Sequence, residues 1–221
     1  MQWGFPESVS TFGSEIDSIY TLILYVTGAM FVIVEAALIY FVVRYRRREE
    51  RKAEYIEGHR GAEILWTAVP FLLVGLLAFR SADTWLDVKG ADTVPPDALE
   101  IAVAASQFEW NVTYPGPDGR LGTDDDIADR NELNIPVDRP VRVTLTAEDV
   151  IHSFFLPEFR VKQDAVPGME THVWFEATRT GDYVLGCAEL CGLGHYRMRG
   201  TVTVHEPDAF ERWQQEESAA S

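Results

Sequence analysis

The sequence predicts a hairpin of two membrane-spanning helices followed by a small all-β domain. Two strongly apolar segments, residues 16–43 and 62–82, lie early in the chain, and from about residue 98 onward apolar and polar residues alternate along several short runs. The chain is 47% hydrophobic, yet its mean hydropathy is only −0.08, so very apolar regions must be balanced by strongly polar ones. This segregation is typical of a membrane anchor joined to a water-exposed domain.

The N-terminal segment, residues 1–15, is mixed and polar, and it has no basic stretch ahead of an apolar core. A cleaved signal peptide is therefore not evident. Residues 16–43 exceed the roughly 20 helical residues that cross a hydrocarbon core. Glu35 interrupts this first span. Because an ionisable side chain is costly at that depth, we expect it to face protein or water, either as a neutral carboxyl against a partner or as part of a proton relay.

Residues 44–61 form a loop rich in arginine and lysine, which predicts that it stays on the cytoplasmic side of the membrane. The second span, residues 62–82, contains Pro70, which neighbouring helices can accommodate. Both ends of the hairpin, and with them both chain termini, are therefore expected outside the cytoplasm in a multi-pass cell-membrane protein. Residues 83–97 include Asp92-Thr-Val-Pro-Pro-Asp97, a composition that favours a stiff linker.

Residues 98–206 show the period-2 alternation of half-buried strands, in runs separated by Pro, Gly and Asp turns. Such runs predict a small β-sandwich or barrel; they begin at Leu99, Val141, Val173, Gly181 and Thr201. The tail, residues 207–221, has the composition of a short helix with Pro207 near its start. Between the first strands, the carboxylates of Asp124–Asp126 could hold calcium, but the lack of a full EF-hand spacing favours a solvated hairpin loop.

The formal net charge is −16, with a pI near 4.6. This balance argues against a nucleic-acid partner. It favours a basic protein partner, or an environment of high salt in which acidic surfaces remain soluble. The two cysteines are too few for a disulfide scaffold, so we expect them to have a local function.

The candidate site is the stretch Cys187-Ala-Glu-Leu-Cys191-Gly-Leu-Gly-His195-Tyr-Arg-Met198, which places two thiols, an imidazole and a thioether in one short loop. A second imidazole, His152, lies upstream. Thiolate and thioether are soft donors that favour copper, and imidazole also suits copper. Two other interpretations stay open: a small disulfide between the cysteines, or a structural zinc held by the two Cys and two His residues. Neither of these explains Met198.

This loop, together with His152 and Asp164-Ala-Val-Pro-Gly168, resembles the dinuclear copper A site of cytochrome c oxidase subunit II. The resemblance covers nearly the whole chain, and it implies a cupredoxin-like Greek-key barrel for residues 98–206. It also implies that Cys187 and Cys191 bridge two coppers. His152 and Met198 would complete one copper, and His195 with the backbone carbonyl of Glu189 would complete the other. The Glu189 carboxylate would face a magnesium ion at the border with subunit I.

A second resemblance lies at the start of the second span. Glu63-Ile-Leu-Trp66-Thr-Ala-Val-Pro70 is similar to the family's Glu-x-x-Trp-Thr-x-x-Pro. It implies that Glu63 lies near the mouth of a proton channel into subunit I. The alternative is an ordinary acidic residue at a helix N-terminus, where the helix dipole favours it.

The sequence departs from the family at Gln107-Phe108-Glu109-Trp110, where the family commonly shows Gln-Trp-x-Trp. Phe108 stands in place of the aromatic residue that receives the electron, so Phe108 and Trp110 are both candidates for that role, with Trp110 alternatively a core residue. The donor could then be a cytochrome c with a different face or a small blue-copper protein. The resemblance implies that the electron donor docks on acidic residues near the copper loops, and the candidates at matching positions are Glu148, Asp149 and Asp164. Asp149 and Asp164 could instead orient loops through hydrogen bonds.

The resemblance implies subunit II of a haem-copper cytochrome c oxidase, which passes electrons to the haem of subunit I for O2 reduction coupled to proton pumping. Subunits I and III would be its partners in the membrane. No catalytic nucleophile with a general base is evident, so oxygen reduction is expected on another subunit. The alternatives are a copper A nitric oxide reductase subunit, a membrane-anchored copper-delivery protein, a quinol oxidase subunit without metal, and a structural zinc module.

Overall fold

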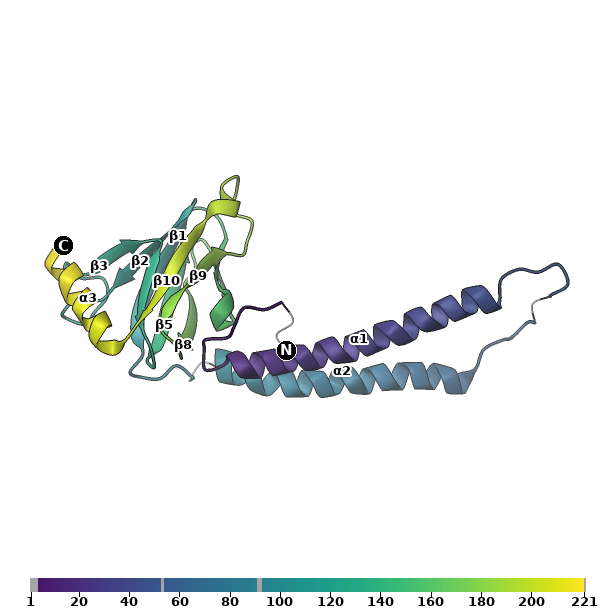
Figure 1. The fold of residues 1–221 in the computed structure, drawn as a ribbon. Coiled ribbons are helices and arrows are strands. Elements are labelled where there is room, and N and C mark those ends of the chain that lie inside the picture. The colour runs from purple at the N-terminus through teal and green to yellow at the C-terminus, as the bar shows by residue number, and fades with distance from the viewer. Residues whose placement is uncertain (1–3, 53, 91–92, 221) are drawn as a thin grey trace. The chain divides into compact units, whose positions relative to one another are not determined.

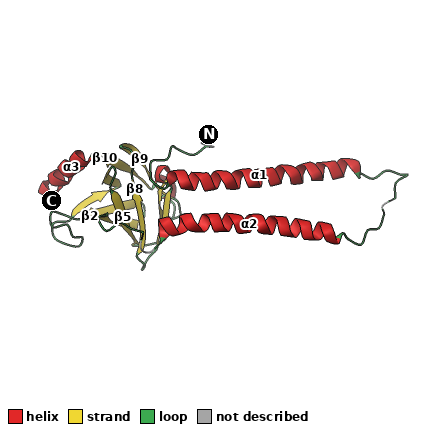
Figure 2. Ribbon diagram, turned by 90° about the horizontal axis from the view of Figure 1, so that it is seen from below, coloured by secondary structure: helices red, strands yellow, loops and turns green. Residues whose placement is uncertain are grey.

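The computed structural model describes residues 4–52, 54–90 and 93–220, which fall into two units. One unit is Glu15–Leu86, and the other combines Met1–Ser14 with Asp87–Ser221. Outside the described residues lie residues 1–3 of the predicted N-terminal segment, residue 53 of the basic loop, residues 91–92 of the predicted linker and residue 221 of the tail. Figures 1 and 2 show the elements of each unit.

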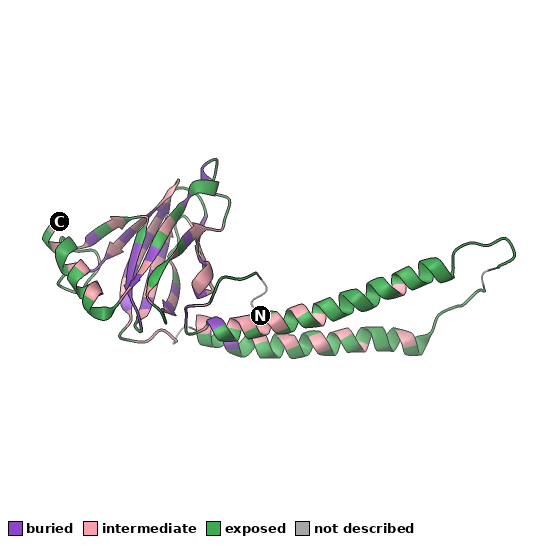
Figure 3. Ribbon diagram, viewed as in Figure 1, coloured by how far each residue is buried: buried purple, intermediate pink, exposed green. Residues whose placement is uncertain are grey.

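The first unit is built from two long helices, α1 (Gly13–Arg44) and α2 (Arg60–Lys89). Both are long and apolar enough to cross a membrane, and their apolar side chains are exposed along most of their length (Figure 3). Near the start of α1, the carboxylate of Glu15 accepts a hydrogen bond of 2.7 Å from the Thr84 hydroxyl of α2. The two predicted spans therefore lie inside the observed helices.

The second helix extends further than the apolar pattern predicted. It continues to Lys89, so residues 83–89, expected in the linker, are helical. Trp85, Leu86 and Val88 keep the segment apolar between its charged residues, and the chain leaves the helix at Gly90. The end of a membrane-spanning stretch is thus not the end of the helix, because helix formation continues in water where no residue breaks it.

The β-domain consists of two five-stranded sheets. The first contains, in spatial order, β3 (Ile127–Arg130), β2 (Glu109–Tyr114), β1 (Leu99–Ser106), β5 (Pro140–Ala147) and β8 (Thr171–Glu176). The second contains β4 (Glu132–Pro136), β10 (Arg199–His205), β9 (Gly181–Cys187), β6 (His152–Leu156) and β7 (Val161–Ala165). Neighbouring strands are antiparallel except for the pairs β1–β5 and β4–β10, which are parallel.

One hydrophobic core receives side chains from both sheets, so the domain is a β-sandwich. Alternate residues of β1 and β5 point inward, as the period-2 pattern predicted. All five predicted runs lie in strands: β1, β5, β8, β9 and β10. The other strands were missed because most are only four or five residues long, and β6 is buried on both faces and therefore lacks the alternation.

The N-terminal segment packs on the β-domain. Val9 is fully buried in the core, its N–H donates to the Glu158 carbonyl at 2.9 Å, and its own carbonyl accepts from Thr178 N–H at 2.8 Å. The ring of Phe12 lies edge-on to Trp174 with 4.5 Å between centroids. Residues just before α1 are therefore an integral part of the β-domain.

The tail forms α3 (Pro207–Ala220), a helix that begins at Pro207 as predicted. Trp213 packs edge-on against Tyr114 and stacks on His205, which anchors α3 to both sheets. The acidic loop between β2 and β3 is stabilised internally. The carboxylates of Asp125 and Asp126 accept hydrogen bonds from the backbone N–H groups of Asp118 and Gly122.

Candidate metal centre

Neighbouring strands of the second sheet bring the donor atoms together. Cys187 is the last residue of β9, and the loop that follows carries Cys191, His195 and Met198 before β10 begins at Arg199. His152 is the first residue of β6. Strand β6 pairs with β9 through Phe154 and Cys187, so His152 lies two residues from the partner of a cysteine. Strand pairing, not sequence proximity, delivers this ligand.

The donor atoms converge. The two Sγ atoms lie 3.9 Å apart, and the Cys191 Sγ lies 3.7 Å from both His195 Nδ1 and Met198 Sδ. His152 Nδ1 lies 3.2 Å from Met198 Sδ, and the Cys187 thiol lies 3.2 Å from the Glu189 carbonyl oxygen. The donor atoms of His152, Cys187 and Cys191 all fall within 4.8 Å of one another. The structure thus assembles every predicted copper ligand in one cluster.

These distances suit a shared metal. A thiolate–metal bond of about 2.3 Å allows two sulfurs on one ion to lie up to about 4.6 Å apart. The observed 3.9 Å fits within this limit and is far beyond a disulfide bond of about 2.05 Å. Both cysteines are free, so the disulfide interpretation is not what the structure contains. The buried thioether of Met198, next to His152 and Cys191, matches a soft metal such as copper and has no place in a tetrahedral Cys2His2 zinc site.

Burial affects the thiols unequally. Cys191 is buried, and Cys187 is partly exposed. Desolvation, reinforced by the nearby Cys187, raises the pKa of the Cys191 thiol to about 11. Metal binding must therefore displace a tightly held proton at Cys191, which makes the apparent metal affinity depend on pH.

Asp149 orients the His152 ring. Its Oδ1 lies 2.8 Å from His152 Nε2, and its Oδ2 accepts the backbone N–H of Gln107 at 2.7 Å. Partial burial alone would raise the pKa of the Asp149 carboxyl, but the hydrogen bonds from His152, Val150 and Gln107 hold that pKa below its usual value. With Nε2 engaged, Nδ1 is left to face the donor cluster, which is the usual arrangement of a metal-binding histidine.

The turn that carries Phe108 packs against the metal loop. The Gln107 side chain donates to the Cys191 carbonyl at 2.5 Å. A Cβ on Gly192 would lie 3.3 Å from the Phe108 ring, and one on Gly194 would overlap the ring. Gly192 also has φ of +132°, a backbone conformation that other residues rarely adopt. The two glycines therefore let the metal loop close over Phe108.

The other candidate aromatic lies in the interior. Trp110 is fully buried and packs edge-on against His152 and Phe154, with centroid distances of 6.2 and 5.7 Å. Phe108 is only partly buried and lies against the metal loop, with the guanidinium of Arg197 5.9 Å from its ring centroid. Phe108 is thus the one of the two that reaches the surface, whereas Trp110 is a core residue in contact with a candidate ligand.

The three predicted docking acids differ in their surroundings. Asp149 uses both carboxylate oxygens within the domain, as described above. Asp164 accepts from the Ser153 hydroxyl at 2.7 Å and from Lys162 at 3.1 Å, and the Ser153 hydrogen bond is the main cause of its lowered pKa. Glu148 is exposed, and within the described chain its carboxylate has no hydrogen-bond or ion-pair partner.

Two predicted carboxylates take no part in the donor cluster. The Glu189 residue is exposed, and only its carbonyl contacts the cluster. Glu63 lies in the first turn of α2, exposed, where both the proton-channel and the helix-dipole interpretations remain compatible with its position.

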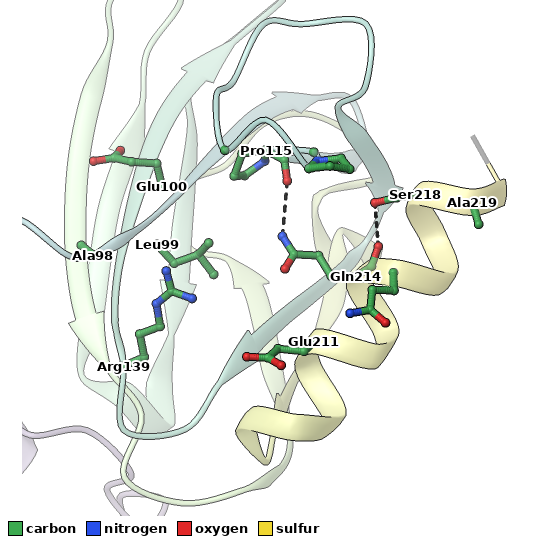
Figure 4. Close-up of a pocket in the computed structure, with 13 residues that line it drawn as sticks. Ala98, Leu99, Glu100, Pro115, Arg139, Glu211, Gln214, Ser218 and Ala219 are labelled. Carbon is green, nitrogen blue, oxygen red and sulfur yellow. Dashed lines mark hydrogen bonds between the residues drawn. The ribbon is translucent and has the colours of Figure 1, made fainter.

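Sequence reasoning missed Gln107 and the apolar tip of the loop. Leu193, between the two glycines, is 97% exposed, and Val150 and Ile151 are exposed beside Asp149. An apolar residue flanked by glycines in a polar domain was a signal that could have identified the tip. A pocket lies elsewhere, between α3 and the β2–β3 loop. It measures about 740 Å³ and includes none of the candidate ligands (Figure 4).

The fold and the donor cluster define a class of protein: a β-sandwich that follows two helices long and apolar enough to span a membrane, with a donor cluster suited to a soft metal ion. The family model "Cytochrome C oxidase subunit II, transmembrane domain" matches residues 1–83, and "Cytochrome C oxidase subunit II, periplasmic domain" matches residues 110–204. Cytochrome c oxidase subunit 2 of Thermostichus vulcanus is 34% identical over 97% of this chain and 78% of its own length. The alternative cytochrome c oxidase subunit 2 of Bradyrhizobium diazoefficiens is 33% identical over 96% and 82%.

Solved structures agree. The periplasmic domain of subunit II of cytochrome oxidase from Bradyrhizobium japonicum has a TM-score of 0.51 and 32% identity, covering 57% of this chain and 98% of that one. A mixed disulfide between a thioredoxin-like protein and subunit II has a TM-score of 0.50 and 31% identity, covering 59% and 97%. The chain belongs to the cytochrome c oxidase subunit II family, and the predicted cupredoxin-like fold is confirmed. It is a subunit of a haem-copper oxidase.

Proposed function

We propose that this subunit receives single electrons from a soluble redox protein at a dinuclear copper centre and passes them to the haem of subunit I, where O2 reduction is coupled to proton pumping. The observation that carries the proposal is the convergence of two thiols, two imidazoles, a thioether and a carbonyl at 3.2–3.9 Å spacings. Six donor atoms are more than one tetrahedral copper site uses, so the set suits a pair of copper ions, and its sulfurs and nitrogens are ligands that copper favours.

Cys187 and Cys191 would bridge the coppers, with His152 and Met198 on one side and His195 and the Glu189 carbonyl on the other. When bound, the copper pair supplies reversible one-electron transfer. The chain's own contribution is rigidity: β6 and β9 fix His152 and Cys187, and Gln107 holds the Cys191 carbonyl. Ligands that are held in place before reduction need little rearrangement on electron transfer, and the groups behind them tune the reduction potential.

The electron-donor protein would dock at a surface that we call the apolar rim, formed by Phe108, Val150, Ile151 and Leu193. Gln107 connects its parts, since its backbone binds Asp149 and its side chain binds the metal loop. Glu148, and the partly exposed Asp149 and Asp164, would surround the rim with negative charge and steer a basic donor such as cytochrome c, or a small blue-copper protein. Phe108 is our candidate for the residue that receives the electron, with Trp110 behind it.

Two carboxylates would connect the subunit to proton and metal sites of subunit I. Glu63 would lie at the mouth of a proton channel, and Glu189 would bind a magnesium ion through its exposed side chain. An oxidase is favoured over a copper A nitric oxide reductase because Glu63 provides this acidic group at the start of α2. Subunit III would complete the membrane complex.

The hairpin would place both termini outside the cytoplasm and the basic loop inside. Packing of Val9 in the β-domain supports this orientation, because it requires the start of α1 and the β-domain to lie on the same side of the membrane. An oxidising compartment would also explain why a relative forms a mixed disulfide with a thioredoxin-like protein. We propose that the thiols of this chain likewise need reduction before copper is loaded.

A membrane-anchored copper-delivery protein is the competing function. A carrier needs an exposed, exchangeable site for one ion, whereas His152, Cys191 and Met198 are buried. Quantifying copper in the full-length chain purified with its partner subunits tests the proposal. We expect two coppers per chain and a mixed-valence electron-spin signal, which His195→Asn should abolish and the matched control His172→Asn should leave unchanged. One exchangeable copper would favour delivery, and zinc without redox activity would favour a structural module.

A further inference from the structure

Glu35 lies deep within the apolar length of α1. It is nine residues before Arg44 and eighteen after Asp17, the nearest charged residues on either side. At 1.5 Å per helical residue, these separations are about 13 Å and 27 Å. The hydrocarbon core of a bilayer is about 30 Å thick. With Arg44 at the cytoplasmic boundary, the Glu35 carboxyl therefore lies near the middle of the membrane.

Within the described part of the chain, no side chain pairs with that carboxyl. Glu35 is exposed, and among the described residues none forms a hydrogen bond or ion pair with it. The second span has no ionisable side chain between Glu63 and Arg80 that could compensate it. Thr27, by contrast, is satisfied within its own helix, because its hydroxyl donates to the Ile23 carbonyl at 2.7 Å.

The helix face around Glu35 suits close packing against another helix. Thr21, Gly28 and Glu35 recur every seven residues and therefore share one stripe of α1, which we call the Glu35 face. A Cβ built on Gly28 meets no atom within 4 Å, so the space in front of it is open. Small residues at such positions let a partner helix approach closely enough for interhelical hydrogen bonds.

Lipid chains cannot satisfy a carboxyl, since they offer no hydrogen-bond donor or acceptor. Ionisable groups within membrane spans accordingly face protein or water and pair with polar groups there. The occupant must lie beside α1 in the same bilayer. A subunit that takes electrons from the β-domain must also lie close to this chain, which makes the haem-bearing subunit the partner that meets both requirements.

We propose that the Glu35 face binds a transmembrane helix of the haem-bearing subunit, and that a polar side chain of that helix forms a hydrogen bond with the Glu35 carboxyl. The partner side chain is a hydroxyl, an amide or a protonated base. This inference rests on the proposed function, because it requires that the chain works within an oxidase complex. Glu35 is then a positioning residue that fixes how α1 packs within the complex.

The first test measures how firmly the subunits associate. The complex is purified through a tag on this chain, and the haem retained per chain is followed as detergent is raised. Glu35→Leu should shift the dissociation equilibrium about threefold to twentyfold, the range for one hydrogen bond between membrane helices. Glu35→Gln, which keeps the hydrogen-bonding shape, should stay close to wild type. The double variant Glu35→Leu with Ile33→Glu carries the carboxyl on the opposite side of the helix and should not restore association.

The second test identifies the occupant directly. A photoreactive benzoylphenylalanine replaces Phe31, one turn from Glu35, or Phe41 as a matched aromatic position about 120° away. Position 31 should crosslink to the haem-bearing subunit and position 41 should do so less. Retention of haem by Glu35→Leu, rescue by Ile33→Glu, or crosslinks from position 31 only to lipid or to a second copy of this chain would each overturn the inference.

Copper content and the electron-spin signal are measured on the same samples. A wild-type complex without the copper pair contradicts the proposed function. A complex with the copper pair in which Glu35→Leu changes nothing contradicts only the Glu35 inference. The two failures are therefore distinguishable.

Discussion

The Asp149 carboxylate joins a metal ligand to the turn beneath the metal loop: it lies 2.8 Å from His152 Nε2 and accepts the Gln107 N–H at 2.7 Å. Gln107 in turn binds the Cys191 carbonyl. Asp149, on the β5–β6 loop, thus links His152 to the turn at Gln107, and Gln107 links that turn to the metal loop. Both segments that supply candidate ligands are therefore connected to the surface where the electron-donor protein would dock.

Asp149→Asn should weaken copper binding and shift the reduction potential. The amide keeps the size of the side chain but removes the negative charge behind His152, and comparable changes in groups behind a metal ligand cost about 10- to 100-fold in affinity. Competition titration against a copper chelator and a redox titration measure the two effects. Glu148→Gln removes the adjacent charge without touching a ligand and should change neither; equal effects from both variants would refute the positioning role.

Gly194→Ala should destabilise the β-domain by about 1–3 kcal/mol, the usual effect of overpacking, because its Cβ would overlap the Phe108 ring. Thermal unfolding followed by tryptophan fluorescence measures the change. Adding Phe108→Ala should recover part of the loss, since the two side chains would no longer compete for space. Strictly additive losses in the double variant would mean that the glycine is needed for another reason.

Leu193→Ser should lower kcat/KM for the electron donor at every salt concentration, because it removes apolar contact area from the centre of the docking surface. Glu148→Gln should act differently: it should weaken the salt dependence of the donor association rate, since it removes a charge that steers encounter. Stopped-flow reduction of the copper centre at several ionic strengths separates the two. A salt-dependent loss with Leu193→Ser would contradict apolar docking.

In the copper-free protein, the two thiols should react with an alkylating agent at different rates. With a pKa of about 11, Cys191 has only about one thiolate in a thousand at pH 8, and it is buried, so Cys187 should react first with an alkylating agent. Peptide mass spectrometry after brief treatment of the copper-free chain assigns the modified residue. Copper-loaded protein should resist modification at both positions, and faster labelling of Cys191 would refute the assignment.

His205 should make the stability of the β-domain depend on pH. Burial lowers the pKa of this histidine, whose Nε2 lies 2.8 Å from the Asn134 side-chain oxygen. Below the unfolded pKa near 6.5, the unfolded chain binds a proton that the folded chain resists. The free energy of unfolding should therefore fall as the pH drops through 6.5 towards the lower folded pKa. Denaturant unfolding of His205→Gln should show a flatter profile over this window; an unchanged profile would exclude His205 as the cause.

A structural feature can be predicted from the sequence alone when it depends on residues that lie close together in the chain. The ligands Cys187, Cys191, His195 and Met198 occupy one loop, so their spacing and donor types favoured a soft-metal site over a disulfide or a structural zinc. The two spans were predictable because membrane crossing depends on the length of an apolar segment, and β1 and β5 because one face of each strand is buried.

Features that depend on contacts between distant segments were decided only by the tertiary structure. The position of His152 beside Cys187 follows from the pairing of β6 with β9, and the roles of Asp149 and Gln107 follow from hydrogen bonds between different loops. The packing of Val9 into the β-domain likewise cannot be predicted from the residues next to it in the sequence. Local composition determines which residues can form helices, strands and ligands. Strand register and loop closure determine which of them meet, because these depend on hydrogen bonds and packing across the whole domain.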